Sequence, residues 1–284
     1  MAATGAAINE DTGIRQTFLS SKISNLLTMC KQKSITGANV TFLHRCEEKC
    51  RTAACLLESS GNKKIMIDSA RQYMQALLDF TYIDENDLVD KDFPEAIAKD
   101  MVHNILVTIP DTTLFVREIF GDDADITEIL GVELLECIHW RRGALMYMYC
   151  HTLHDDSHRL QHNLDHFIKM LSEGVNHLSK MLKTRPTNFD GVQCDDSTLQ
   201  LIQQGIFSDT HLLALMYAGE MCHWHTMASK DLQQPISLVD SGKQFLQKFI
   251  DIVNGPMTGT GWQDTTAKQL LQELQSILPN QYLT

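Results

Sequence analysis

Residues 136–151 read ECIHWRRGALMYMYCH, an almost wholly apolar run with two adjacent arginines in its middle. Large apolar side chains recur three and four residues apart in and just before this run, which is the period of an α-helix and not of a strand. The stretch therefore predicts a helix that buries one broad face in a protein core. The residues of that face are Leu134, Ile138, Leu145, Met148 and Tyr149.

The same helical period runs through most of the chain, and alternating strand patterns are hard to find. Only 6 prolines interrupt the pattern. We therefore expect an all-α fold, a single domain of antiparallel helical hairpins. No segment repeats at a fixed period, so a solenoid-like stack stays an open variant without support from repeats. Helices are expected near residues 15–32, 39–58, 64–82, 94–108, 112–120, 124–153, 157–184, 196–227, 236–254 and 263–278.

Polar segments predict where the helical domain begins and where it is interrupted. Residues 1–14 are expected to form a flexible N-terminus, and residues 15–284 the helical domain. Within that domain, a polar surface loop is expected near 228–241. Residues 84–95, DENDLVDKDFPE, are expected to form an acidic, solvated connection between two helices.

The composition is that of a soluble globular protein, with 43% hydrophobic and 21% charged residues among 284. Its formal net charge of -12 argues against binding of nucleic acid, because a phosphate backbone attracts a basic surface. The start of the chain lacks the basic and apolar regions of a signal peptide, and no window approaches the roughly 18 apolar residues of a membrane span. We expect a cytoplasmic protein without direct membrane insertion, whose 8 cysteines are reduced thiols.

Four histidines spaced four residues apart, His154, His158, His162 and His166, are the strongest candidates for metal ligands. Neighbours at this spacing on a helix can bind Zn²⁺ together. All four cannot, because each step of four residues turns about 40° around the helix. We therefore predict neither a metal nor another cofactor. A metal-dependent helical enzyme that uses this ladder is kept as an alternative.

Motifs of nucleophilic and phosphate chemistry are absent from the sequence, which contains no G-x-S-x-G elbow, no P-loop and no G-x-G-x-x-G within a βαβ pattern. Cys137 and His139 are two residues apart, so on a helix they point to different faces and cannot act as nucleophile and base. We therefore predict that the protein is not an enzyme and has no catalytic residues.

The arginine pair of the opening stretch indicates either a core contact or a partner-binding edge. Arg141 and Arg142 lie about 100° apart on a helix, so at most one can point into the apolar face. The first interpretation is that one of them, with Arg141 as the choice, braces a neighbouring helix while the other lies at the surface. The second places both beside Trp140 on a contact surface, because Trp, Tyr and Arg dominate binding hot spots. Candidate carboxylate partners are Glu133, Glu136 and Glu220.

A second segment, GIFSDTHLLALMYAGEMCHWH at residues 205–225, is the expected companion of the first. It carries an apolar stripe at helical spacing and a glycine, Gly219, that allows another helix to approach closely. Gly143 is expected to have the same packing role in the first segment. The residues predicted to bind a partner are Trp140, Arg141, Arg142, Tyr147, Glu220 and Trp224.

These segments, GVELLECIHWRRGALMYMYCHTL at 131–153 and the stretch at 205–225, resemble the signature segments of the Rab-interacting Mon–Ccz complex subunit family. Residues 75–95 and the C-terminal Gly255-Pro256, Trp262 and Thr266-Ala267-Lys268-Gln269 resemble it as well. The resemblance implies a non-enzymatic cytosolic adaptor that associates with the Mon–Ccz guanine nucleotide exchange factor and with the GDP-bound late-endosomal Rab GTPase.

The resemblance also implies a cellular role. Members of the family support the supply of the GTPase to membranes in endolysosomal traffic, and the delivery of damaged mitochondria to lysosomes by autophagy (mitophagy). The protein would then reach mitochondria or late endosomes through its partners. A purely structural scaffold subunit, without direct contact to the GTPase, is a further alternative.

Overall fold

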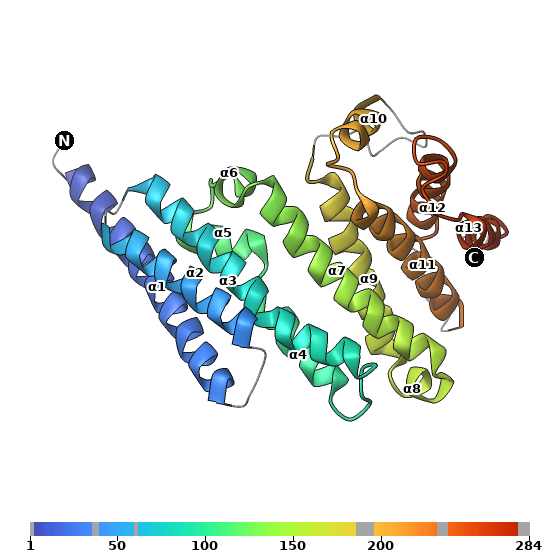
Figure 1. The fold of residues 1–284 in the computed structure, drawn as a ribbon, viewed down its shortest axis with the longest axis horizontal. Helices are drawn as coiled ribbons and strands as arrows, with labels where there is room; N and C mark the ends of the chain where they lie inside the picture. Colours follow the sequence, from blue (N-terminus) through green and yellow to red (C-terminus); the bar gives the residue numbers. More distant parts are fainter. Residues whose placement is uncertain (1–2, 36–39, 60–61, 186–195, 232–237, 278–284) are drawn as a thin grey trace. The chain divides into compact units, whose positions relative to one another are not determined.

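The structure is a computed structural model that describes residues 3–35, 40–59, 62–185, 196–231 and 238–277. These residues form thirteen α-helices and no strand, which confirms the expected all-α fold (Figure 1). None of the helices in these ranges is long and apolar enough to cross a membrane. The contacts group the chain into two compact units, residues 1–138 and 139–284.

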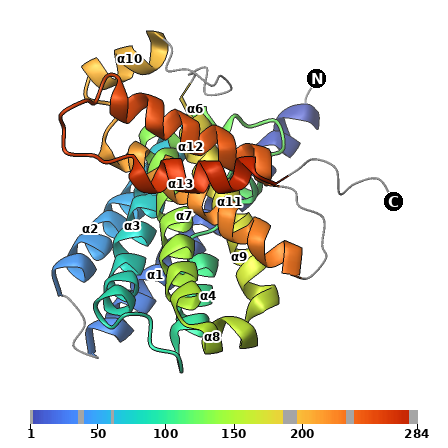
Figure 2. The same ribbon diagram turned by 90° about the vertical axis from the view of Figure 1, so that its right-hand side faces the viewer.

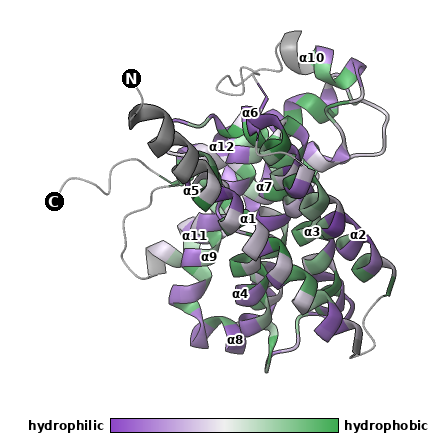
Figure 3. Ribbon diagram, turned by 90° about the vertical axis from the view of Figure 1, so that its left-hand side faces the viewer, coloured by the Kyte–Doolittle hydropathy of each residue, from purple (hydrophilic) through white to green (hydrophobic). Residues whose placement is uncertain are grey.

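The first two helices of the first unit meet in an apolar seam. Buried side chains of the first helix, Leu19, Ile23, Leu26 and Cys30, recur at steps of four and three residues. Those of the second helix follow the same rule, so two apolar stripes face each other. Figure 3 shows hydrophilic and hydrophobic residues alternating along these helices. The helices of this unit are α1 (Ala3–Ile35), α2 (Val40–Ser59), α3 (Lys63–Asp90), α4 (Ala98–Thr108), α5 (Thr112–Phe120), α6 (Ile126–Leu130) and the first turns of α7 (Val132–Asp155).

The second unit is organised around one long helix, α11, which packs on α9, α12 and α13. Figure 2 shows α12 and α13 lying side by side over α11. Besides the remainder of α7, the helices of this unit are α8 (Ser157–His162), α9 (Leu164–Lys183), α10 (Asp196–Gln203), α11 (Asp209–Asp231), α12 (Val239–Asn254) and α13 (Thr265–Gln275).

Short polar side chains start several of these helices. The carboxylate of Asp111 accepts hydrogen bonds from the first free backbone N–H groups of α5, and Asp125 and Asp156 do the same for α6 and α8. The side chain of Asn62 caps α3 in this way. Part of the acidic excess of the chain therefore serves to begin helices, where a negative charge also meets the positive end of the helix dipole.

Three long segments that the sequence predicted as single helices are divided. Gly131, with φ of 81°, ends α6 just before α7 begins, so the segment expected at 124–153 is two helices. Asn163 separates α8 from α9 within the segment expected at 157–184. A turn after Gln203 divides the segment expected at 196–227 into α10 and α11.

Other segments that the sequence placed outside helices are helical. Because α1 begins at Ala3, most of the N-terminus that was expected to be flexible lies in a helix. The acidic connection expected at 84–95 is largely the end of α3, since Leu88 is buried and holds this turn of the helix against the core. The polar loop expected near 228–241 is shorter, because α11 continues to Asp231; residues 232–237 lie outside the described residues.

Candidate partner-binding site

Five rings from α7 and α11 lie in one near-parallel series, which we call the aromatic stack. Its central pair is Tyr147 and Tyr217, whose ring centroids are 3.6 Å apart and whose planes are inclined by 8°. Trp140 stacks on the outer side of Tyr217 at 5.9 Å, and Trp224 lies 5.7 Å from Tyr147. His154 completes the series at 4.7 Å from Trp224. The rings thus alternate between the two helices and join them.

The stack follows from the spacing of its members along the chain. On α7 the ring residues are 140, 147 and 154, and on α11 they are 217 and 224, so neighbours on each helix are seven residues apart. Seven residues complete nearly two helical turns, so each set lies along one face. Packed aromatic pairs contribute about 0.5–1.5 kcal/mol beyond the area they bury. The stack therefore helps to hold α7 on α11.

A hydrogen bond fixes the centre of the stack. The hydroxyl of Tyr147 donates to Oε2 of Glu220 at 2.8 Å. Burial, and then the negative charge of Glu220, raise the pKa of Tyr147 above its ordinary value. The same two causes raise the pKa of Tyr217. Both phenols are therefore neutral hydrogen-bond donors near neutral pH.

Exposure differs along the stack. Trp224 is only 6% exposed, so its ring serves mainly the packing of α7 against α11. Trp140, Tyr147, Tyr217 and Glu220 are half-buried and keep a part of their surface accessible. Of the residues predicted to bind a partner, the structure thus brings together Trp140, Tyr147, Glu220 and Trp224. All of these except Trp224 keep accessible surface. The sequence analysis missed Tyr217, although its spacing of seven residues from Trp224 was a usable signal.

The two arginines of the opening stretch show no contrast between core and surface, because both are half-buried. Nε of Arg142 donates to Nε2 of His177 on α9 at 3.0 Å. Glu220, which was considered as a partner for an arginine, accepts its hydrogen bond from Tyr147 instead. Arg142 therefore joins α7 to α9 through a histidine.

The histidine that receives Arg142 belongs to a buried pair. Nδ1 of His177 lies 3.1 Å from Nδ1 of His139, and both residues are buried. Because a guanidinium can only donate, Nε2 of His177 is an acceptor and the proton of this ring is on Nδ1. His177 then donates to His139, whose own proton is on Nε2.

Two glycines that the sequence singled out lie where helices approach most closely. A Cβ atom added at Gly143 would lie 2.6 Å from Cγ of Leu178 on α9 and 3.3 Å from its backbone nitrogen. A Cβ atom added at Gly219 would lie 2.6 Å from Cγ of Leu246 on α12. These positions set the distance of α7 from α9 and of α11 from α12. Helix glycines with equally close neighbours that the sequence analysis did not single out are Gly174 and Gly242.

The four histidines expected to form a ladder are distributed over three helices. His154 is on α7, His158 and His162 are on α8, and His166 is on α9. Only the two on α8 keep the relation of helical neighbours, with ring centroids 4.4 Å apart. In the part of the chain that the structure describes, no three His, Cys, Asp or Glu side chains are grouped so that they could hold a metal ion. The metal-dependent alternative finds no ligand set within those ranges.

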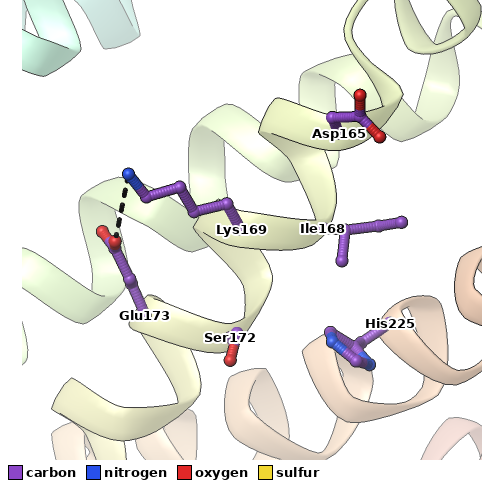
Figure 4. Close-up of a pocket in the computed structure, with 6 residues that line it drawn as sticks. All are labelled: Asp165, Ile168, Lys169, Ser172, Glu173 and His225. Atoms are coloured by element: carbon purple, nitrogen blue, oxygen red, sulfur yellow. Dashed lines mark ion pairs between the residues drawn. The ribbon is translucent and has the colours of Figure 1, made fainter. Parts of the chain in front are cut away.

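A groove of about 490 Å³ lies between α9 and α11, apart from the aromatic stack (Figure 4). Figure 4 shows Ile168 and Ser172 on the side that faces His225, and the ion pair of Lys169 with Glu173 at 3.8 Å on the far side. Burial lowers the pKa of His225, whose Nδ1 shares a hydrogen bond with Ser229 at 3.3 Å. None of the residues predicted to bind a partner lines this groove; its lining is Asp165, Ile168, Lys169, Ser172, Glu173 and His225.

A comparison with known protein families finds a match over the part of the chain that contains this site. One family model matches residues 42–235, and its description is RAB7A-interacting MON1-CCZ1 complex subunit 1. The match covers more than half of the chain and contains the whole aromatic stack. The chain belongs to this family. The resemblance read from residues 131–153 and 205–225 is thereby confirmed.

Three relatives named RAB7A-interacting MON1-CCZ1 complex subunit 1 extend the match. The protein of Danio rerio is 40% identical over 228 residues, which cover 77% of this chain and 81% of the relative. The Homo sapiens protein is 37% identical over 221 residues, 70% of this chain and 75% of the relative. The Mus musculus protein is 36% identical over 225 residues, 72% and 76% of the two chains. No solved structure matches the chain.

Proposed function

We propose that this chain is a non-enzymatic adaptor subunit that binds RAB7A or its counterpart and the MON1-CCZ1 complex. The observation that supports this proposal is the family match, since the family and its three relatives are described as RAB7A-interacting subunits of that complex. The matches extend over 75% to 81% of the relatives' own length. A similarity of that extent concerns most of the protein and not one exchangeable module.

The finer part of the proposal concerns the state of the GTPase and the place of action. We infer that the chain binds the GDP-bound form and supports the supply of the GTPase to membranes in endolysosomal traffic and mitophagy. It acts from the cytoplasm and reaches mitochondria or late endosomes through its partners. These features rest on the family resemblance, which the signature segments at 131–153 and 205–225 carry.

The accessible edge of the aromatic stack is the contact surface in this proposal. Trp140, Tyr217 and Tyr147 present half-buried rings, and Glu220 adds a carboxylate beside them. Tryptophan and tyrosine are frequent in binding hot spots. Stacking holds these rings in position before a partner arrives, so little conformational entropy is lost on binding.

Capture of purified partners tests the proposal. The full chain is immobilised and offered the GTPase, loaded with GDP or with a GTP analogue, and the MON1-CCZ1 pair. We expect capture of the GDP-loaded GTPase and of the pair. Trp140→Ala should weaken capture about tenfold or more, the loss typical of a hot-spot residue. Its melting temperature should fall by no more than about 2–4 °C, because only one stacked pair at the end of the series is lost.

Trp262→Ala is the matched control, since Trp262 is another half-buried tryptophan of the second unit and lies outside the stack. It should bind as the wild type does. Capture of the MON1-CCZ1 pair without any capture of the GTPase would support the purely structural scaffold instead. Normal binding by Trp140→Ala would place the contact surface elsewhere.

A further inference from the structure

Three cysteines meet in the seam between α1 and α2 of the first unit. The sulfur atoms of Cys30 and Cys46 are 3.0 Å apart, and both residues are 0% exposed. Cys50 follows Cys46 by one helical turn and is equally buried. A disulfide has an S–S distance of about 2.05 Å, so Cys30 and Cys46 are separated from bonding by an approach of roughly 1 Å.

The packing of the seam keeps these two sulfurs opposite each other. Cys30 continues the buried stripe of α1 one turn after Leu26, and Cys46 continues that of α2 one turn after Leu43. Both side chains therefore point into the same seam because of their helical register. Neither has to leave its place in the core to reach the other.

The two thiols of the pair differ in their readiness to ionise. The hydrogen bond with Cys46 lowers the pKa of Cys30 and outweighs its burial and the charge of Glu47, which raise it; the charge of Lys33 also lowers it. The same hydrogen bond raises the pKa of Cys46. Because the thiolate is the nucleophilic form, this difference favours Cys30 as the attacking sulfur and Cys46 as the thiol that resolves the product.

We propose that Cys30 and Cys46 form an oxidation site whose co-substrate is a hydroperoxide. The Cys30 thiolate attacks a peroxide oxygen, the O–O bond breaks, and the leaving oxygen takes up a proton to form water or an alcohol. The sulfur of Cys46 then attacks the sulfenic acid of Cys30, which forms the S–S bond and breaks the S–O bond. The hydroxide released combines with the proton of Cys46. In total the two thiols lose two electrons and two protons, and the peroxide gains them.

The position of the pair near helix ends gives the oxidant a way in. Cys30 is five residues from the end of α1 at Ile35, and Cys46 is six residues from the start of α2 at Val40. Helix ends open locally at a lower free-energy cost than the middle of a core. A hydroperoxide as small as hydrogen peroxide can therefore reach Cys30 without global unfolding, and the disulfide that forms would join α1 to α2.

Trypsin separates the three thiols, which makes the experiment direct. Cleavage leaves Cys30 in ISNLLTMCK (23–31), Cys46 in CEEK (46–49) and Cys50 in CR (50–51). The folded full chain is treated with hydrogen peroxide, denatured, alkylated, digested without reduction and examined by mass spectrometry. We expect peptide 23–31 joined to peptide 46–49, with loss of this species after treatment with dithiothreitol. In Cys46→Ser the joined peptide should be absent, and a dimedone adduct should mark the sulfenic acid of Cys30.

Other cysteines of the chain supply the controls. Cys150 and Cys222 are also buried, burial raises the pKa of each, and they should be fully alkylated after denaturation. The exposed Cys55 reports that the oxidant has acted. The proposal is overturned by peptide 23–31 joined to 50–51, or by free Cys30 and Cys46 in a sample whose Cys55 is oxidised. Neither outcome depends on a variant that must fold.

Discussion

Gly143→Ala should lower the free energy of unfolding by about 1 kcal/mol, although alanine forms helices better than glycine by about that amount. The added Cβ atom would lie 2.6 Å from Cγ of Leu178, which is about 1 Å inside an ordinary carbon–carbon contact. Leu178 is 0% exposed, and its backbone nitrogen is 3.3 Å from the same point, so the neighbour cannot turn away. Overpacking costs about 1–3 kcal/mol, which leaves a net loss of about 0–2 kcal/mol.

Urea unfolding followed by far-ultraviolet circular dichroism measures this loss, with Gly13→Ala as the matched control. Gly13 is also inside a helix, but apart from its chain neighbours and the backbone of that helix no described atom lies within 4 Å of its added Cβ atom. Alanine at position 13 should therefore stabilise the protein by about 1 kcal/mol. The same substitution is thus expected to change stability in opposite directions at the two positions. If Gly143→Ala stabilises as much as Gly13→Ala does, the close approach of α7 and α9 is refuted.

Three further outcomes are expected. Gly219→Leu should lower the melting temperature more than Gly143→Ala does, because a larger side chain is forced onto Leu246; a wild-type melting curve would contradict this. Arg142→Ala should cost about 1 kcal/mol in urea unfolding, since His177 loses its hydrogen-bond donor, and unchanged stability would show that this bond contributes nothing. Burial lowers the pKa of His225, so below pH 6.5 the unfolded state takes up the proton first and stability falls with the pH. Unfolding free energies at about pH 7.5 and about pH 5.5 should show this decrease, and His225→Gln should reduce it.

Local signals in the sequence predicted the fold class and some boundaries well. The helix expected at 112–120 coincides with α5, where Asp111 caps the start and Gly121 follows the last residue. By contrast, the end of α3 depends on the burial of Leu88. The acidic residues around Leu88 made this stretch look like a solvated loop in the sequence. The break at Asn163 carries neither proline nor glycine, so no strong local signal marks it. Tertiary packing therefore decided the end of α3, whereas the missed break between α6 and α7 carries a local signal, the glycine at position 131.

The sequence predicted which two segments form the candidate site, but not which side chains of the two segments contact each other. Trp140, Tyr147 and Trp224 were chosen as hot-spot residue types, and the structure places all three in one stack. That Tyr217 lies between Trp140 and Tyr147 requires the register of α7 against α11, which one sequence does not contain. The partner of Arg142 is a histidine on another helix, whereas helical geometry fixed only the angle between the two arginines.

Because the chain divides into two units, tryptophan fluorescence and circular dichroism report on different parts of it. All three tryptophans, at positions 140, 224 and 262, lie in residues 139–284, and residues 1–138 contain none. Tryptophan fluorescence therefore follows the unfolding of the second unit alone, while far-ultraviolet circular dichroism follows the helices of both. Coincident urea transitions in the two signals would mean that the chain unfolds as one cooperative body. A circular dichroism transition that begins before or ends after the fluorescence transition would give the stability of the first unit without any label.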